Sequence, residues 1–176
     1  MRAAEVAIRP ATLTDAHEIA ALHVAVSQAT YRDLAPPETL QRLNLAHRTA
    51  RWTELLQKGE RIALVAERAG KIIGIGTAGA ASVLELGTRG EILHLYVDPT
   101  HARAGIGRAL MRALALALKA QGYNAIALGV VEGNQPAIDF YKQLGGRLAG
   151  SYIDPGPLWR SRNQIIIWDD IETLLT

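Results

Sequence analysis

The strongest chemical signal in the chain is a short loop with two glycines and two arginines, residues 102–108 (ARAGIGR). It follows a run of strand-forming residues, 91–97, and opens a segment whose apolar residues recur at helical spacing. The first N–H groups of a helix have no partners inside it, and the helix dipole favours negative charge there. Glycine lets these groups approach an anion without obstruction by a Cβ atom. The pattern predicts a phosphate-binding loop, with a plain tight turn as the alternative.

A second glycine motif, residues 74–79 (GIGTAG), matches the dinucleotide fingerprint G-x-G-x-x-G letter for letter. That fingerprint requires a crossover helix directly after it. Residues 80–87 are too few for such a helix, and the preceding strand returns through a hairpin. Glycine in a strand more often marks a bulge or a close approach of backbone. We therefore predict a structural role for these glycines. A P-loop is excluded because G-x-x-x-x-G-K-[ST] does not occur.

Composition limits the classes of protein to which the sequence can belong. The 176 residues, 49% of them hydrophobic, are enough for one domain, residues 1–176. A net charge of +2 without a concentrated basic run predicts no nucleic-acid partner. The chain has no cysteine, and its histidines lack metal-ligand grouping, so we expect no disulfide and no metal. Neither a signal peptide nor a membrane-spanning segment is predicted, which favours a cytoplasmic protein without a membrane partner.

Hydrophobic periodicity predicts an α/β fold with a mixed, mostly antiparallel sheet flanked by helices. A β-hairpin is expected around Ala69-Gly70, and residues 82–86 extend its second arm or form another short strand. Asp15 and Glu18 are spaced for a capping box at the start of the first helix. Predicted strands are residues 6–9, 61–67, 71–78, 91–97, 125–131, 147–152 and 164–169; predicted helices start near residue 15 and cover residues 38–43, 47–57, 107–121 and 134–144.

Two segments together resemble a known family. The loop resembles the acetyl-coenzyme A signature of the GCN5-related N-acetyltransferases (GNAT), [RQ]-x-x-G-x-[GA]. Residues 134–146 (NQPAIDFYKQLGG), one helix and one strand further on, resemble the family's second signature, N-x-x-A-x-x-F-Y-x-x-x-G-F. The likeness covers nearly the whole chain. Ala102 replaces the usual Arg or Gln, and Gly146 replaces the usual aromatic residue. We expect the main-chain cradle to survive the first change and packing to absorb the second.

The resemblance implies a single-domain GNAT-like fold and an N-acetyltransferase that moves an acetyl group from acetyl-CoA to a primary amine by direct attack on the thioester. Tyr141, a phenol able to protonate the departing thiolate, takes the catalytic role of general acid. The strand before the loop binds the pantetheine arm as an added strand would. The implied cofactor-binding residues are Leu95, Tyr96, Val97, Arg103, Ala104, Gly105, Ile106, Gly107, Arg108, Asn134 and Tyr141. A non-catalytic acyl-CoA-binding module is the alternative.

The base that takes the amine proton is assigned to Glu91, where many members of the family have an acid, with His94 as the alternative. A separation of three puts these side chains on opposite faces of a regular strand, and a bulge would change this. A water chain could also connect Glu91 to the amine.

The acceptor, a small-molecule or peptide amine, is expected to enter near Tyr31 and the loop around Trp159. Asp33 or Asp154 could attract an ammonium group there. Arg160 and Arg162 instead favour an acidic acceptor, so the sequence leaves both chemistries open. A homodimer is compatible with the resemblance.

Overall fold

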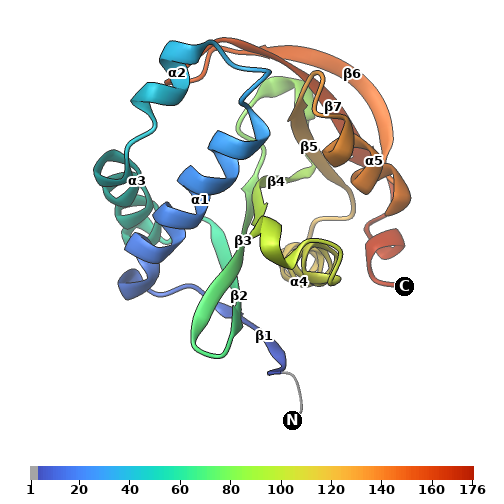
Figure 1. Ribbon diagram of the computed structural model, residues 1–176. Helices are drawn as coiled ribbons and strands as arrows, with labels where there is room; N and C mark the ends of the chain where they lie inside the picture. The colour runs from blue at the N-terminus through green and yellow to red at the C-terminus, as the bar shows by residue number, and fades with distance from the viewer. Residues whose placement is uncertain (1–3) are drawn as a thin grey trace.

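A seven-stranded sheet runs through the protein, and the computed structural model describes it within residues 4–176 (Figure 1). The strands are β1 (Val6–Pro10), β2 (Ile62–Arg68), β3 (Lys71–Ala80), β4 (Gly90–Val97), β5 (Ile126–Val131), β6 (Arg147–Asp154) and β7 (Ser161–Trp168). They lie in the order β1-β2-β3-β4-β5-β7-β6. Neighbouring strands are antiparallel except β4 and β5, which are parallel. The predicted mixed, mostly antiparallel sheet is confirmed.

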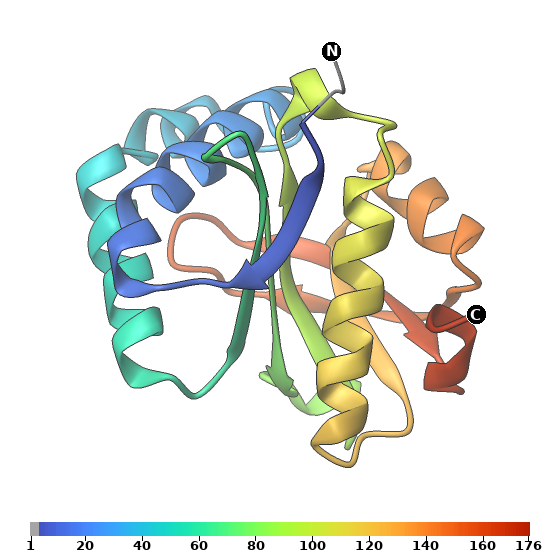
Figure 2. The ribbon, with the colours of Figure 1, turned by 90° about the horizontal axis from the view of Figure 1, so that it is seen from below.

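Helices cover both faces of this sheet. They are α1 (Ala16–Thr30), α2 (Pro37–Arg42), α3 (Leu45–Lys58), α4 (Ile106–Ala120) and α5 (Gln135–Gln143). Figure 2 shows α1, α2 and α3 gathered on one side of the strands β1 to β4, with α4 on the other side. Ile19 of α1, Trp52 of α3 and Ile75 of β3 belong to one buried cluster. Leu110 of α4 belongs to another, with Ile73 of β3. Alternate side chains along β3 therefore point to opposite faces of the sheet and pack into two separate hydrophobic cores.

The stretch after β3 forms no strand, although one was predicted for residues 82–86. It contains a 3-10 turn, Leu84–Leu86, that ends at Gly87, whose φ of 65° reverses the chain. Leu86 is fully buried and Leu84 is exposed. The alternating apolar pattern, which resembles that of a strand, thus comes from a single inward leucine on a turn.

The capping box predicted for Asp15 and Glu18 does not form. Asp15 instead closes a box with Thr12, whose backbone N donates to Asp15 Oδ2 at 2.7 Å. Glu18 turns toward the β2–β3 hairpin, where its Oε1 accepts a hydrogen bond from Ile72 N at 2.8 Å. The capping-box spacing therefore located the start of the helix correctly but assigned Asp15 the wrong partner, Glu18 instead of Thr12.

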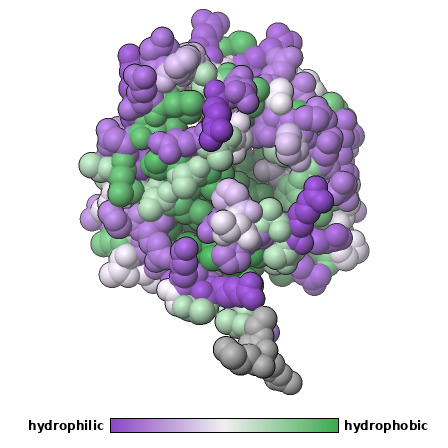
Figure 3. All heavy atoms as spheres, viewed as in Figure 1, coloured by the Kyte–Doolittle hydropathy of each residue, from purple (hydrophilic) through white to green (hydrophobic). Residues whose placement is uncertain are grey.

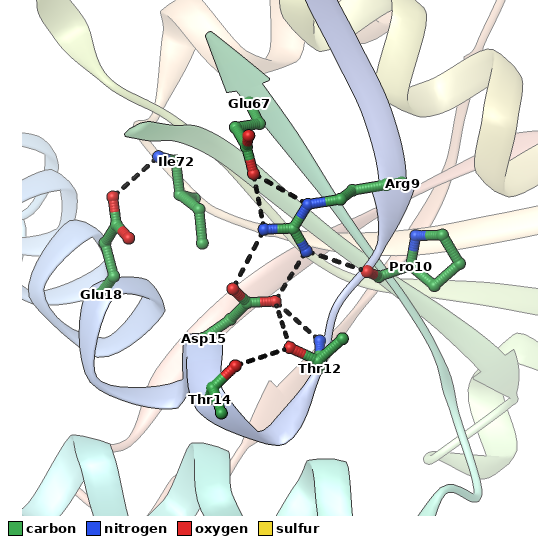
Figure 4. A network of polar contacts seen from close by, with 8 residues as sticks. All are labelled: Arg9, Pro10, Thr12, Thr14, Asp15, Glu18, Glu67 and Ile72. Atoms are coloured by element: carbon green, nitrogen blue, oxygen red, sulfur yellow. Dashed lines mark hydrogen bonds and ion pairs between the residues drawn. The ribbon is translucent and has the colours of Figure 1, made fainter. Parts of the chain in front are cut away.

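Arg9 of β1 is the partner that the capping-box prediction did not include, and it connects the start of the helix to the sheet (Figure 4). Its Nη1 lies 2.8 Å from Asp15 Oδ2, and its Nη2 lies 2.6 Å from Glu67 Oε2. The guanidinium of Arg9 lowers the pKa of the Asp15 carboxyl by hydrogen bonding. A charged partner from β1 therefore replaces the local partner from α1.

The glycines of the GIGTAG motif serve packing, as predicted. A Cβ atom on Gly74 would lie 3.0 Å from Leu110 Cδ1, and one on Gly76 would lie 2.6 Å from Leu114 Cδ1. Both leucines are fully buried on α4. The absence of side chains at Gly74 and Gly76 thus lets α4 lie close to β3. Helix α4 is the helix that follows the predicted phosphate-binding loop.

Gly76→Ala is expected to lower the free energy of unfolding by about 1–3 kcal/mol, since the new Cβ must displace Leu114 from a filled core. Denaturant titration measures this loss. Gly79→Ala is the matched control on the same strand. Its added Cβ would meet the flexible Arg61 side chain, the nearest atom lying at 3.2 Å. Equal losses from the two variants would contradict the packing explanation.

The sheet opens between β4 and β5. Their pairing covers two residue pairs, Gly90↔Ile126 and Glu91↔Ala127, after which the strands diverge. A bulge accompanies the divergence: Thr77 of β3 faces His94, whereas the next residue, Ala78, faces Ile92, which leaves Leu93 without a counterpart. Beyond Glu91, the β5-facing edge of β4 is therefore left without a strand partner.

Candidate active site

A cavity of about 1780 Å³ lies at the opening between β4 and β5. Figure 3, in the view of Figure 1, shows a hollow on this side of the molecule, with apolar residues inside and hydrophilic residues around its rim. Ten of the predicted cofactor-binding residues line the cavity: Leu95, Tyr96, Val97, Arg103, Gly105, Ile106, Gly107, Arg108, Asn134 and Tyr141. Ala104 and Glu91 do not. Strand, loop and the second signature segment thus converge on one space.

The loop before α4 has an unusual backbone. Arg103 has a φ of 61° and Gly105 a φ of 78°, both in the left-handed region. For a non-glycine residue such as Arg103 this conformation costs roughly 1 kcal/mol or more, and such strain gathers at functional sites. Gly105 is the N-cap of α4, and Ile106 anchors the first turn in the core. The turn therefore presents its unpaired N–H groups to the cavity from a fixed position.

Helix α5 is held against the start of α4 by an aromatic contact. A Cβ on Gly107 would lie 3.1 Å from Phe140 Cζ, so glycine allows the two helices to approach here. The ring of Tyr141 lies 5.2 Å from that of Phe140 and 6.1 Å from that of Trp168. Asn134 is the N-cap of α5, as predicted, but its side chain makes no capping hydrogen bond. It lines the cavity instead.

Three tyrosine side chains meet in the cavity. Burial raises the pKa values of Tyr31, Tyr96 and Tyr141, and the neighbouring phenols add to the increase for Tyr96 and Tyr141. Their hydroxyl groups have no hydrogen-bond partner within residues 4–176. All three phenols are therefore protonated near neutral pH and available to a bound molecule.

An aromatic cluster forms the floor on the α1–α3 side. The His23 ring stacks on Tyr96 with centroids 4.5 Å apart, and Trp52 Nε1 donates to His23 Nδ1 at 3.0 Å. His94 lies 4.9 Å from Trp52, and its Nδ1 is 2.7 Å from Thr77 Oγ1. Burial lowers the pKa values of both histidines to about 3. Both imidazoles are neutral at physiological pH.

Glu91 lies on the same face of β4 as His94, because the bulge at Leu93 shifts the register between them. Its carboxylate is 2% exposed and accepts hydrogen bonds from Ser82 N at 2.7 Å and Ser82 Oγ at 3.0 Å. His94 lines the cavity and Glu91 does not. Because the carboxylate of Glu91 lies outside the cavity lining, its role as the base stays a prediction that requires a water chain.

His23 and Arg48 are among the cavity-lining residues that sequence reasoning missed. His23 was predicted only as part of an apolar helix stripe, and Arg48 was not singled out. Arg48 precedes Trp52 by one helical turn, so the pair shares a face of α3. That spacing is the signal that could have found it. Within the described residues no group of three potential ligands is arranged to hold a metal ion.

The sequence model of the Acetyltransferase (GNAT) family matches residues 23–146, which span the hairpin, the loop and both signatures. The chain belongs to this family. It is therefore an acetyl-CoA-dependent acetyltransferase, as the loop and Tyr141 segment predicted.

Relatives of this GNAT acetyltransferase support the same placement. An uncharacterized N-acetyltransferase of Bacillus subtilis (strain 168), YuaI, is 31% identical over 137 residues, which are 78% of this chain and 78% of the relative. An L-methionine sulfoximine/L-methionine sulfone acetyltransferase of Pseudomonas aeruginosa is 28% identical over 109 residues, 61% of this chain and 63% of that protein.

Solved structures of GNAT proteins share the fold. A GCN5-related N-acetyltransferase from Rhodopseudomonas palustris superposes with a TM-score of 0.74 at 20% identity, covering 95% of this chain and 97% of that one. The PaiA N-acetyltransferase from Thermoplasma acidophilum, in complex with coenzyme A, gives a TM-score of 0.71 at 17% identity over 93% of this chain and 98% of that one. No helix in residues 4–176 is long and apolar enough to span a membrane.

Proposed function

We propose that this protein transfers the acetyl group of acetyl-CoA to a primary amine by direct attack of the amine on the thioester. One observation carries the proposal: the open edge of β4, the left-handed loop before α4 and the phenol of Tyr141 line one continuous cavity. An extended ligand arm can complete the edge, an anion can occupy the helix terminus, and an acid stands at the far end.

The cofactor is proposed to lie along this line. Its pyrophosphate accepts hydrogen bonds from the N–H groups of the loop, with Arg103 and Arg108 supplying positive charge. Its pantetheine arm hydrogen-bonds the main chain of Leu95, Tyr96 and Val97. Ala104, whose side chain is outside the cavity lining, contributes only its backbone.

The reaction needs one acid and one base. The amine nitrogen attacks the thioester carbonyl carbon, the C–S bond breaks, and the thiolate takes the phenolic proton of Tyr141. The raised pKa of Tyr141 keeps that proton in place until the thiolate forms. The amine loses its proton to His94 or to water linked to Glu91. The neutral state of His94 leaves a ring nitrogen able to accept it, although its low pKa makes it a weak base.

A small-molecule amine is the favoured acceptor class. The P. aeruginosa relative is named for two amino-acid analogues, and the match covers 61% of this chain and 63% of that protein. A peptide amine is the second candidate. A non-catalytic acyl-CoA-binding module is the alternative to both. Release of free CoA in the presence of an amine panel separates the enzyme from the module.

Acetyl-CoA is expected to raise the melting temperature by about 5–10 °C at a concentration of 100 times its Kd, since binding then stabilises the folded state by about 2.7 kcal/mol. Differential scanning fluorimetry measures the shift. Gly105→Ala should reduce it, because its Cβ is forced onto a φ of 78° in the loop.

Gly122→Ala is the matched control for that variant. Gly122 lies beyond the other end of α4 with a φ of 94°, and a Cβ at either glycine would meet nothing within 4 Å. Both variants lose stability, but only the loop variant should lose the response to acetyl-CoA. An undiminished shift in Gly105→Ala would remove the loop from the cofactor site.

A further inference from the structure

Arg48 is a positive charge without an anion. It lies on α3 and lines the cavity, and its Nε is buried with no hydrogen-bond partner. It forms no ion pair in the described part of the chain. Arg48 as a whole is half-buried, and burying its Nε atom without a hydrogen-bond partner is costly unless a bound group supplies one.

The other cations on this side of the cavity have acidic neighbours. Arg51 Nη1 lies 3.0 Å from Glu54 Oε2, and Lys58 Nζ lies 2.9 Å from Glu54 Oε1. Arg61 Nη2 lies 3.9 Å from Glu91 Oε2. Arg61 Nη1 is also buried without a hydrogen-bond partner, but Arg48 differs from these three side chains because it forms no ion pair within residues 4–176.

The side chains around Arg48 cannot neutralise it. Burial, and to a lesser extent the charge of Arg48, lowers the pKa values of His23 and His94, so both are uncharged at neutral pH. The phenol of Tyr96 is protonated there as well. The Asp154 carboxylate, which also lines the cavity, accepts a hydrogen bond from Gly156 N and makes no ion pair with Arg48. An anion bound in the cavity would supply the negative charge that these side chains do not.

That anion is not the pyrophosphate of the cofactor. Arg48 lies on α3, whereas the phosphate-type loop opens α4, and these helices cover opposite faces of the sheet (Figures 1 and 2). The anion therefore belongs to the acceptor side.

We propose that Arg48 binds a carboxylate of the acceptor, and that the acceptor is a free α-amino acid or a similar small amino carboxylate. A planar guanidinium suits a carboxylate because it can donate two parallel hydrogen bonds. Arg48, Tyr96 and Tyr141 all line the same cavity, so a carboxylate held by Arg48 and the acid of the reaction share one space. A shared cavity fits a small acceptor that carries both an amine and a carboxylate. The inference rests on the proposed acetyl transfer to an amine.

Matched acceptors test it. L-leucine, L-phenylalanine and L-glutamine are each compared with their own carboxamide, with acetyl-CoA saturating and CoA release as the readout. The native protein should favour the acid by at least about tenfold in kcat/KM, the weight of a charge-assisted hydrogen bond. Arg48→Met should lower kcat/KM for the acid by about 10- to 100-fold, mainly through KM, and change the carboxamide by less than about threefold.

Two further variants isolate the charge and its shape. Arg48→Lys keeps the charge and loses the planar fork, so it should restore only part of the preference for the acid. Arg51→Met removes a cation three residues away that already has Glu54 as its partner, and should leave the preference unchanged.

Binding is measured separately, by the melting-temperature shift that each amino acid causes in the CoA-bound protein. Acetylation of the carboxamides as fast as the acids, or equal losses for both in Arg48→Met, overturns the carboxylate site while leaving the acetyltransferase intact. An Arg48-dependent shift without any CoA release supports the carboxylate site and defeats the proposed transfer. Absence of any shift from the acids and of any turnover of them overturns the inference.

Discussion

Replacing Tyr141 with phenylalanine is expected to lower kcat for acetyl transfer by about 100- to 1000-fold, within the range that a positioned general acid contributes. The ring contacts with Phe140 and Trp168 remain in this variant, because phenylalanine keeps the apolar surface that they use. The affinity for acetyl-CoA and the melting temperature should therefore change little. Steady-state kinetics and titration of the cofactor separate the two effects.

Tyr123→Phe is the matched control for this substitution. Tyr123 packs against the main core and does not line the cavity, so loss of its hydroxyl should leave kcat unchanged. A Tyr141→Phe enzyme with full turnover, or one whose turnover and cofactor affinity fall together, would assign Tyr141 to packing. The raised pKa of Tyr141 adds a further expectation: its deprotonation should not limit the rate below about pH 10.

Acidification is expected to weaken the fold well before the carboxylates titrate. In the unfolded chain an imidazole titrates near pH 6.5, whereas the pKa values of His23 and His94 fall to about 3 in the folded protein. Between these values the unfolded state binds more protons, so stability is complete above about pH 6.5 and declines as the pH falls toward 3. Each histidine removes up to about 2 kcal/mol between pH 7.5 and pH 5.

Urea titrations at several pH values between 7.5 and 5 measure this decline. His23→Asn keeps an oxygen that can accept the hydrogen bond from Trp52 Nε1 and removes the titrating group. In this variant the free energy of unfolding should depend less steeply on pH than in the native protein, and the difference in slope should correspond to one titrating proton. An unchanged slope would show that the buried imidazole of His23 does not control acid unfolding.

Local signals explain what the sequence predicted well. The loop of residues 102–108 is recognisable because its glycines lie between a predicted strand and a predicted helix. Tyr141 belongs to a sequence signature that lies within a single helix. Both depend on neighbours within a few residues. Their convergence in one cavity follows from the family fold, in which one helix and one strand separate them.

Features set by distant partners were not predictable in the same way. The side-chain box at Asp15 depends on Arg9, and the orientation of Glu91 depends on a bulge opposite Thr77 and Ala78. A bulge leaves no mark in the alternation of residue types. The clustering of His23, His94 and Trp52 needs three separate elements to meet, so periodicity could place each residue on an apolar face but could not bring them together.

The divergence of β4 from β5 also bears on how the protein avoids unwanted association. A strand edge with free N–H and C=O groups is a template for pairing with other chains. Here the edge of β4 beyond Glu91 lies within the sheet, flanked by α1 and α4, and faces a cavity instead of the outer border. Since α1 and α4 pack on the two faces of β4, this edge is covered from both sides and is less accessible to another sheet than an edge at the outer border. The position of the open edge inside the sheet therefore also protects the protein from edge-to-edge association.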